Sequence, residues 1–81
     1  MKVHVELYSQ LRDLAGAPEL IVDLAEGATV MDLLEQTYAK VPALRSRDRS
    51  ILVGAGVEFV DRNYKVQPGD EISIMPPVQG G

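Results

Sequence analysis

The sequence predicts an α+β fold, in which a mixed β-sheet is packed against one main helix. Short stretches with alternating apolar residues, typical of half-buried strands, recur along the chain. Only residues 29–41 carry a long apolar face at helical spacing, and no strand–helix unit is repeated. A chain of 81 residues has the length of one domain, which we place at residues 1–75, followed by a tail at residues 76–81.

The first part of the domain contains two predicted strands joined by a helical turn. Residues 3–8 alternate between apolar and polar side chains, which predicts a strand with an apolar inner face. We expect Ser9 to cap a short helix that ends at Gly16. Residues 20–24 alternate again, and we expect this second strand to pair antiparallel with the first.

The main helix has clear start and stop signals. Thr29 and Asp32 are spaced as in a capping box, and Pro42 ends the helical pattern. Residues 43–50 are polar and rich in arginine, so we expect a solvated loop there.

The last part of the domain is expected to form three short strands, at residues 51–53, 57–60 and 71–75. The Gly54-Ala55-Gly56 stretch has no helical pattern after it, so we interpret it as a turn or bulge rather than a nucleotide-binding loop. In the final strand, Ile72 and Ile74 should point inward and Met75 should point to the other face.

Composition excludes several kinds of site. The chain has no cysteine, which excludes disulfides and a thiolate metal site or nucleophile. Its one histidine, His4, falls on the outer face of a strand, and we expect it to be exposed or surface-paired without a chemical role. We therefore expect this chain to hold no metal.

The charge and hydropathy patterns indicate the partners of the protein. A net charge of −4 without a basic stripe argues against nucleic acid and suits a basic protein partner. No apolar run approaches the roughly 18 residues of a membrane span, and the N-terminus lacks a signal sequence. We expect a cytoplasmic protein without membrane contact.

The chain ends in Pro76-Pro77-Val78-Gln79-Gly80-Gly81. Two prolines stop the final strand, and the two glycines, which lack Cβ atoms, can pass through a narrow channel. Six extended residues span roughly 20 Å, enough to reach inside another protein. We therefore expect a flexible, extended tail that presents the Gly81 carboxylate. The alternative is an inert end on a plain interaction domain.

Three stretches resemble the molybdopterin synthase small subunit family, which belongs to the ubiquitin-like β-grasp sulfur carriers. They are Leu11-Arg12-Asp13-Leu14-Ala15-Gly16, Pro68-Gly69-Asp70-Glu71-Ile72 and the terminal Pro76-Pro77-Val78-Gln79-Gly80-Gly81. A Gly-Gly end alone is shared by many such carriers, whereas Pro-Pro-Val-x-Gly-Gly points to the molybdopterin branch. The resemblance implies a β-grasp fold.

The resemblance implies a sulfur carrier that is not catalytic alone. Gly81 would be the reacting residue and would carry a thiocarboxylate, while Pro76, Pro77, Val78, Gln79 and Gly80 would line the channel of a partner. An E1-like adenylyltransferase would activate Gly81 with ATP, and a persulfide protein would donate sulfur. The large synthase subunit would receive the tail in a heterotetramer, and this chain would bind no cofactor itself.

The resemblance also implies a docking surface beside the tail. Phe59 and Met75 occupy positions where relatives contact both partners. Phe59 is the one phenylalanine of the chain, and its position in a short strand fits core packing as well as docking. The tail chemistry is shared with other pathways, so a carrier for thiamine synthesis or tRNA thiolation, or a ubiquitin-like modifier, is the alternative function.

Overall fold

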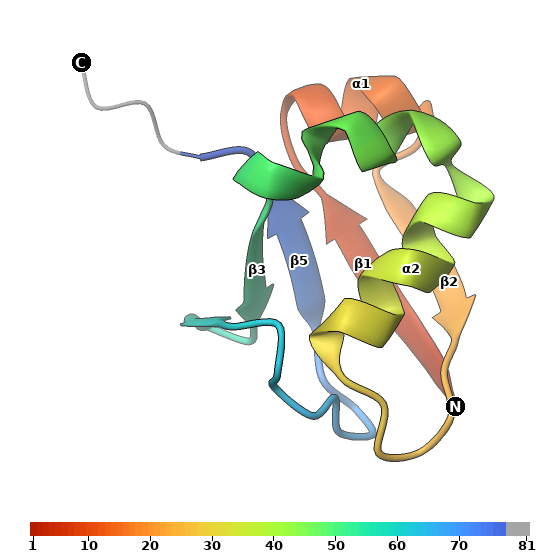
Figure 1. Ribbon diagram of the computed structural model, residues 1–81, viewed down its shortest axis with the longest axis vertical. Coiled ribbons are helices and arrows are strands. Elements are labelled where there is room, and N and C mark those ends of the chain that lie inside the picture. Colours follow the sequence, from red (N-terminus) through yellow and green to blue (C-terminus); the bar gives the residue numbers. More distant parts are fainter. Residues whose placement is uncertain (78–81) are drawn as a thin grey trace.

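The computed structural model describes residues 1–77, and within this range five strands form one sheet (Figure 1). The strands are β1 (Lys2–Leu7), β2 (Glu19–Asp23), β3 (Leu52–Ala55), β4 (Glu58–Val60) and β5 (Ile72–Met75). The helices are α1 (Gln10–Ala15), α2 (Val30–Lys40) and the 3-10 helix η1 (Pro42–Ser50). Helix α2 crosses one face of the sheet, which confirms the predicted α+β architecture.

The sheet has the strand order β2-β1-β5-β3-β4, with β1 and β5 paired in parallel at its centre. Strand β1 pairs antiparallel with β2, as predicted, and β3 pairs antiparallel with both β5 and β4. Parallel neighbours need a long crossover, and here α2, η1 and the β3–β4 hairpin all lie between β2 and β5 in the chain. The first and last strands of the domain therefore lie side by side.

The core lies between α2 and the inner face of the sheet. Alternate residues of β1 are buried, as their period of two predicts, and Ile72 and Ile74 of β5 point inward. The buried face of α2 consists of Val30, Leu33, Leu34, Thr37 and Tyr38. The other buried apolar residues are Val3, Val5, Leu7, Leu11, Val22, Leu24, Leu44, Ile51, Val53, Val66, Ile72 and Ile74.

The predicted signals at both ends of α2 are present. Thr29 Oγ1 accepts the N–H of Asp32 at 3.4 Å, and an Asp32 carboxylate oxygen accepts the N–H of Thr29 at 2.9 Å. These bonds satisfy two donors that a helix start leaves free. At the other end, Val41 leaves helical geometry directly before Pro42.

The segment before β3 is helical, so our expectation of a loop at residues 43–50 is wrong. Helix η1 begins at Pro42, whose missing N–H is tolerated in a first turn. Leu44 is fully buried, and the hydroxyls of Ser46 and Ser50 each donate to a backbone carbonyl three residues earlier. One buried leucine in a polar stretch gives too little periodicity to predict this helix.

Helix α1 ends as predicted but begins differently. Gly16 adopts a left-handed backbone, and its N–H donates to the carbonyl of Arg12. Contrary to prediction, the Ser9 side chain makes no capping hydrogen bond; its carbonyl accepts the N–H of Arg12 instead. Among residues 1–77, Ser9 is the one non-glycine residue with a positive φ, 54°, a conformation that costs roughly 1–3 kcal/mol.

The Gly54-Ala55-Gly56 stretch is divided between a strand and a turn. Strand β3 continues through Ala55, so Gly54 pairs with Ser73 on one side and Phe59 on the other. The expected turn is confined to Gly56, with φ 63°, and to the residue after it. The strand predicted at residues 57–60 accordingly begins one residue later.

We expect Leu34→Ala to lower the free energy of unfolding by about 2–5 kcal/mol, because it leaves a cavity in the core. Leu34 is 1% exposed in α2. In the same helix Met31 is 53% exposed, so Met31→Ala should change stability by less than about 0.5 kcal/mol. Urea denaturation of both variants measures the difference, and equal losses would contradict the packing described for α2.

Candidate functional site

The tail begins directly at the end of β5. This strand is held on both sides, by β1 and β3, and the N–H of Tyr8 donates to the carbonyl of Ile74 at 3.2 Å. Pro76 and Pro77 follow without strand geometry and lie near Arg47 and Ser50 of η1. Figure 1 shows the chain leaving β5 at this end of the sheet. The base of the tail is therefore fixed by the centre of the sheet.

Four residues of the predicted site lie outside the described residues: Val78, Gln79, Gly80 and Gly81. Their assignment to the channel and to sulfur chemistry stays a prediction, as does the division of the chain into a domain at 1–75 and a tail at 76–81.

The sheet face opposite α2 carries an apolar patch close to the tail. We call Tyr8, Leu52, Phe59 and Met75 the open-face patch. Leu52 lies directly opposite Met75, and Phe59 lies opposite Gly54, two residues after Leu52, so their side chains share one face. Tyr8 follows the outward-facing positions of β1 and is 41% exposed. The patch is therefore accessible to a partner protein.

The open-face patch is hollowed because Gly54 has no side chain. The Met75 methyl lies 3.8 Å from the point where a Gly54 Cβ would be. A hollow of about 170 Å³ results, with Tyr8, Phe59 and Met75 among its lining residues. An apolar side chain that protrudes from a partner would fit such a surface.

The structure decides between the two interpretations of Phe59. Its side chain is 67% exposed, so Phe59 is not a core residue. Met75 lies on the outer face, as predicted, and is half-buried. Methionine adapts its shape to different neighbours, which suits a surface used by two partners. The docking role of both residues stays a prediction.

A polar network that the sequence did not reveal connects α2, η1 and the segment after β4. The Tyr38 hydroxyl donates to an Asp48 carboxylate oxygen at 2.5 Å, and Arg62 Nη1 donates to the same oxygen at 2.7 Å. Arg62 Nη2 also donates to the Asp48 backbone carbonyl at 2.6 Å. The Arg45 guanidinium lies 5.2 Å from the centre of the Tyr38 ring, within cation–π distance. The network holds the helical layer to the segment that precedes β5.

This network shifts the pKa values of two of its members. Burial, and then the hydrogen bond to Asp48, raises the pKa of the Tyr38 hydroxyl above its ordinary value. The hydrogen bond from Tyr38, followed by that from Arg62, holds the pKa of the Asp48 carboxyl below its ordinary value. The network is therefore intact when Tyr38 is protonated and Asp48 is ionised.

Other polar groups are distributed over the surface. His4 Nδ1 lies 2.5 Å from a Glu19 carboxylate oxygen on the outer face of the sheet, and the His4 side chain is 62% exposed, which confirms its predicted surface position. Among residues 1–77, no three His, Asp or Glu side chains are placed to share a metal ion. The helices of this part of the chain are too short or too polar to cross a membrane.

Comparison with known proteins assigns the family. The sequence model of the ThiS family matches residues 5–81. The chain belongs to the ThiS family. It is 35% identical to a molybdopterin synthase sulfur carrier subunit of Chlamydomonas reinhardtii, and the similarity covers the full length of both proteins. The predicted resemblance to the molybdopterin synthase small subunit is thus confirmed at the level of the family.

Solved structures confirm the ubiquitin-like β-grasp fold of this ThiS-family chain. SAMP1 from Haloferax volcanii, a small archaeal modifier protein, superimposes with a TM-score of 0.89 at 31% identity and covers all of both chains. A Helicobacter pylori structure shares the fold at a TM-score of 0.70 and 20% identity, again over all of both chains. That structure is a complex of subunits 1 and 2 of molybdopterin-converting factor.

The shifted pKa values predict a stability plateau with two edges. Because the folded pKa of Asp48 is depressed, its contribution is present above the unfolded pKa of about 3.9 and is lost as the pH falls through the folded value. Because the folded pKa of Tyr38 is raised, its contribution is present below the unfolded pKa of about 10 and is lost as the pH rises toward the folded value.

We expect Asp48→Asn to reduce the free energy of unfolding at pH 7 by about 1–2 kcal/mol, since its side chain is 40% exposed and partly screened by water. It should also weaken the loss of stability below pH 4, whereas Tyr38→Phe should weaken the loss above pH 10. Denaturation across pH measures both slopes, with the exposed Glu26→Gln variant as control. Wild-type slopes in both variants would contradict the role of the network.

Proposed function

We propose that this protein carries sulfur on its C-terminal glycine for molybdopterin synthase. The proposal is carried by similarity over the full length: the ThiS-family match extends to residue 81, and a relative that is 35% identical is a molybdopterin synthase sulfur carrier subunit. The emergence of the tail from β5 beside the exposed open-face patch supports this function.

The chemistry begins at the Gly81 carboxylate, which is a poor electrophile. An E1-like partner uses ATP to form a Gly81 acyl-adenylate and releases pyrophosphate. The terminal sulfur of a persulfide donor then displaces AMP to give an acyl disulfide. A thiol cleaves the S–S bond, which leaves a Gly81 thiocarboxylate and a disulfide. The partners supply the ATP site and the acid–base groups, and this chain supplies the carrier.

The loaded tail then enters the large synthase subunit, with which this chain forms a heterotetramer. There the thiocarboxylate sulfur is transferred to the cyclic pyranopterin monophosphate precursor. Two such transfers build the dithiolene that later holds the metal. Gly80 and Gly81 pass through the narrowest part of the channel because they lack side chains. Pro76 and Pro77 stiffen the part of the tail that lies at the channel entrance.

Intact-mass measurement of the protein purified from its own cells tests the carrier function. We expect a species in which one oxygen is replaced by one sulfur. A variant without Gly81, and a variant with one residue added after Gly81, should lack this species but keep the wild-type melting temperature. If the species is missing under every sulfur supply, the carrier function is wrong. A large fall in melting temperature would show that the tail stabilises its own domain.

The similarity to SAMP1 favours a second candidate, in which the protein is a ubiquitin-like modifier or a carrier for another sulfur pathway. Reconstitution distinguishes the two candidates, because their chemistry is the same up to the thiocarboxylate. The loaded protein is combined with the large subunit from the same organism and the pterin precursor. Dithiolene formation supports the molybdopterin function. A thiocarboxylate that yields no dithiolene but joins to lysines of other proteins supports the modifier function.

We expect Phe59→Ala to weaken binding to the large subunit by about tenfold or more, because an exposed aromatic side chain becomes buried on docking. Ile21→Ala is the matched control: Ile21 is 45% exposed and lies opposite His4 on the outer face, at the β2 edge of the sheet. Its removal should change affinity by less than threefold. Calorimetric titration measures both, and equal effects would contradict docking through the open-face patch.

A further inference from the structure

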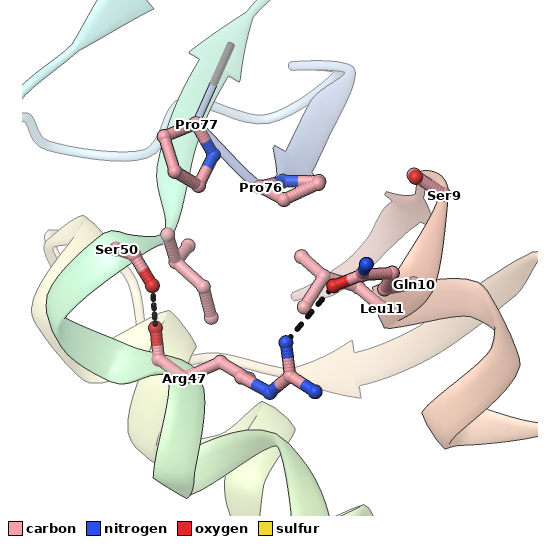
Figure 2. A pocket seen from close by; sticks show the side chains of 8 residues that line it. Ser9, Gln10, Leu11, Arg47, Ser50, Pro76 and Pro77 are labelled. Atoms are coloured by element: carbon pink, nitrogen blue, oxygen red, sulfur yellow. Dashed lines mark hydrogen bonds between the residues drawn. The ribbon is translucent and has the colours of Figure 1, made fainter. Parts of the chain in front are cut away.

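A notch lies at the base of the tail, on the side of the molecule formed by α1 and η1 (Figure 2). We call it the tail-base notch. It has a volume of about 480 Å³, and its walls include Gln10 and Leu11 from α1, Arg47 and Ser50 from η1, and the tail residues Pro76 and Pro77. Figure 2 shows the Arg47 guanidinium across the notch from the two prolines. A group bound there would touch both the domain and the tail.

Arg47 brings a positive charge to the notch that no described residue neutralises. Its Nη1 donates to the neutral Gln10 side chain at 3.0 Å, and no ion pair joins Arg47 to any residue within 1–77. By contrast, Arg45 pairs with Glu35 and Arg62 pairs with Asp48. A guanidinium has five N–H donors, and Gln10 accepts from one. Arg47 is therefore held in position with most of its donors available.

The charge around the notch indicates an acidic occupant. Among the described residues that line the notch, Arg47 alone carries a charge, so the notch itself is positive. The protein as a whole has a net charge of −4. A local basic surface on an acidic protein, beside the segment that enters a partner, favours a complementary acidic surface around the entrance.

We propose that the tail-base notch receives an aspartate or glutamate side chain from the rim of the large-subunit channel that accepts the tail; this inference rests on the proposed function. An Arg guanidinium can bind a carboxylate with two parallel hydrogen bonds, which fixes orientation as well as charge. A four-residue segment spans up to roughly 13 Å at full extension, which is the reach available to Gly81 beyond Pro77. The notch lies at Pro76 and Pro77, where the tail begins, so a partner that takes the tail would meet it at the rim of its channel.

This contact would set the direction in which the tail enters the channel. The open-face patch and the notch lie on different sides of the tail, one on the sheet and the other on the helical layer. Two contacts on different sides of a strand end define its direction, whereas one contact would leave it free to pivot. Arg47 is accordingly a positioning residue that acts on the reacting end through the tail.

Charge reversal of Arg47 tests the inference against a matched control. Arg47→Glu and Arg49→Glu both lie in η1 and change the net charge by the same amount. We expect Arg47→Glu to weaken calorimetric binding to the large subunit by tenfold or more, and Arg49→Glu by less than threefold. The Arg47→Glu effect should shrink as salt is raised. Melting temperatures of both variants and intact-mass measurement of their thiocarboxylates show that folding and activation are retained.

Any other result of this experiment overturns the inference. Equal affinities of the two variants would show that the notch does not recognise an acidic side chain. Tighter binding by Arg47→Glu would identify the C-terminal carboxylate of this chain as the occupant, released by the substitution. If the wild-type protein itself fails to bind the large subunit, the proposed function is wrong and the inference falls with it. Wild-type binding with an unaffected Arg47→Glu variant overturns the inference alone.

Discussion

Hydrogen bonds between β1 and β5 hold the two ends of the domain together at the centre of the sheet. Val5 pairs with Ile72 and Leu7 with Ile74, and all four side chains are buried beneath the helical layer. A slip of one residue in this register would turn the inner faces outward. The same register determines that Met75 faces outward and that the chain leaves the sheet at the next residue. Core packing and presentation of the tail thus depend on one pairing.

Two different surfaces meet at the point where the chain leaves the sheet. The open-face patch offers exposed aromatic side chains, and a few such residues often supply most of the affinity in protein association. The tail-base notch offers a held arginine, and charge complementarity contributes more to orientation and to selection of the partner. In the proposed function, these two surfaces together would direct the Gly81 carboxylate into the site of the partner.

Signals within a few residues predicted the strands and the main helix. The strand order and the side-chain contacts depend on residues that are distant in the sequence. The capping box of Thr29 and the alternation of β1 and β5 each involve only a few consecutive residues, so both were predictable. The end of the last strand before Pro76 was predictable because proline restricts the backbone directly. The strand order, the helix at η1 and the pairing of Arg47 with Gln10 depend on residues far apart in the sequence. The exposure of Phe59 follows from its pairing with Gly54, which a single short strand does not reveal.

The position of β5 between two neighbours has a mechanical consequence. In the proposed function, a force that pulls on the tail would pass through Pro76 into Met75 and along β5. Because β5 is bonded to β1 on one side and to β3 on the other, this load acts in shear on two ladders of hydrogen bonds at once. An edge strand would instead be held by a single ladder. A domain pulled by its tail in this way would therefore resist unfolding more than one whose tail left an edge strand.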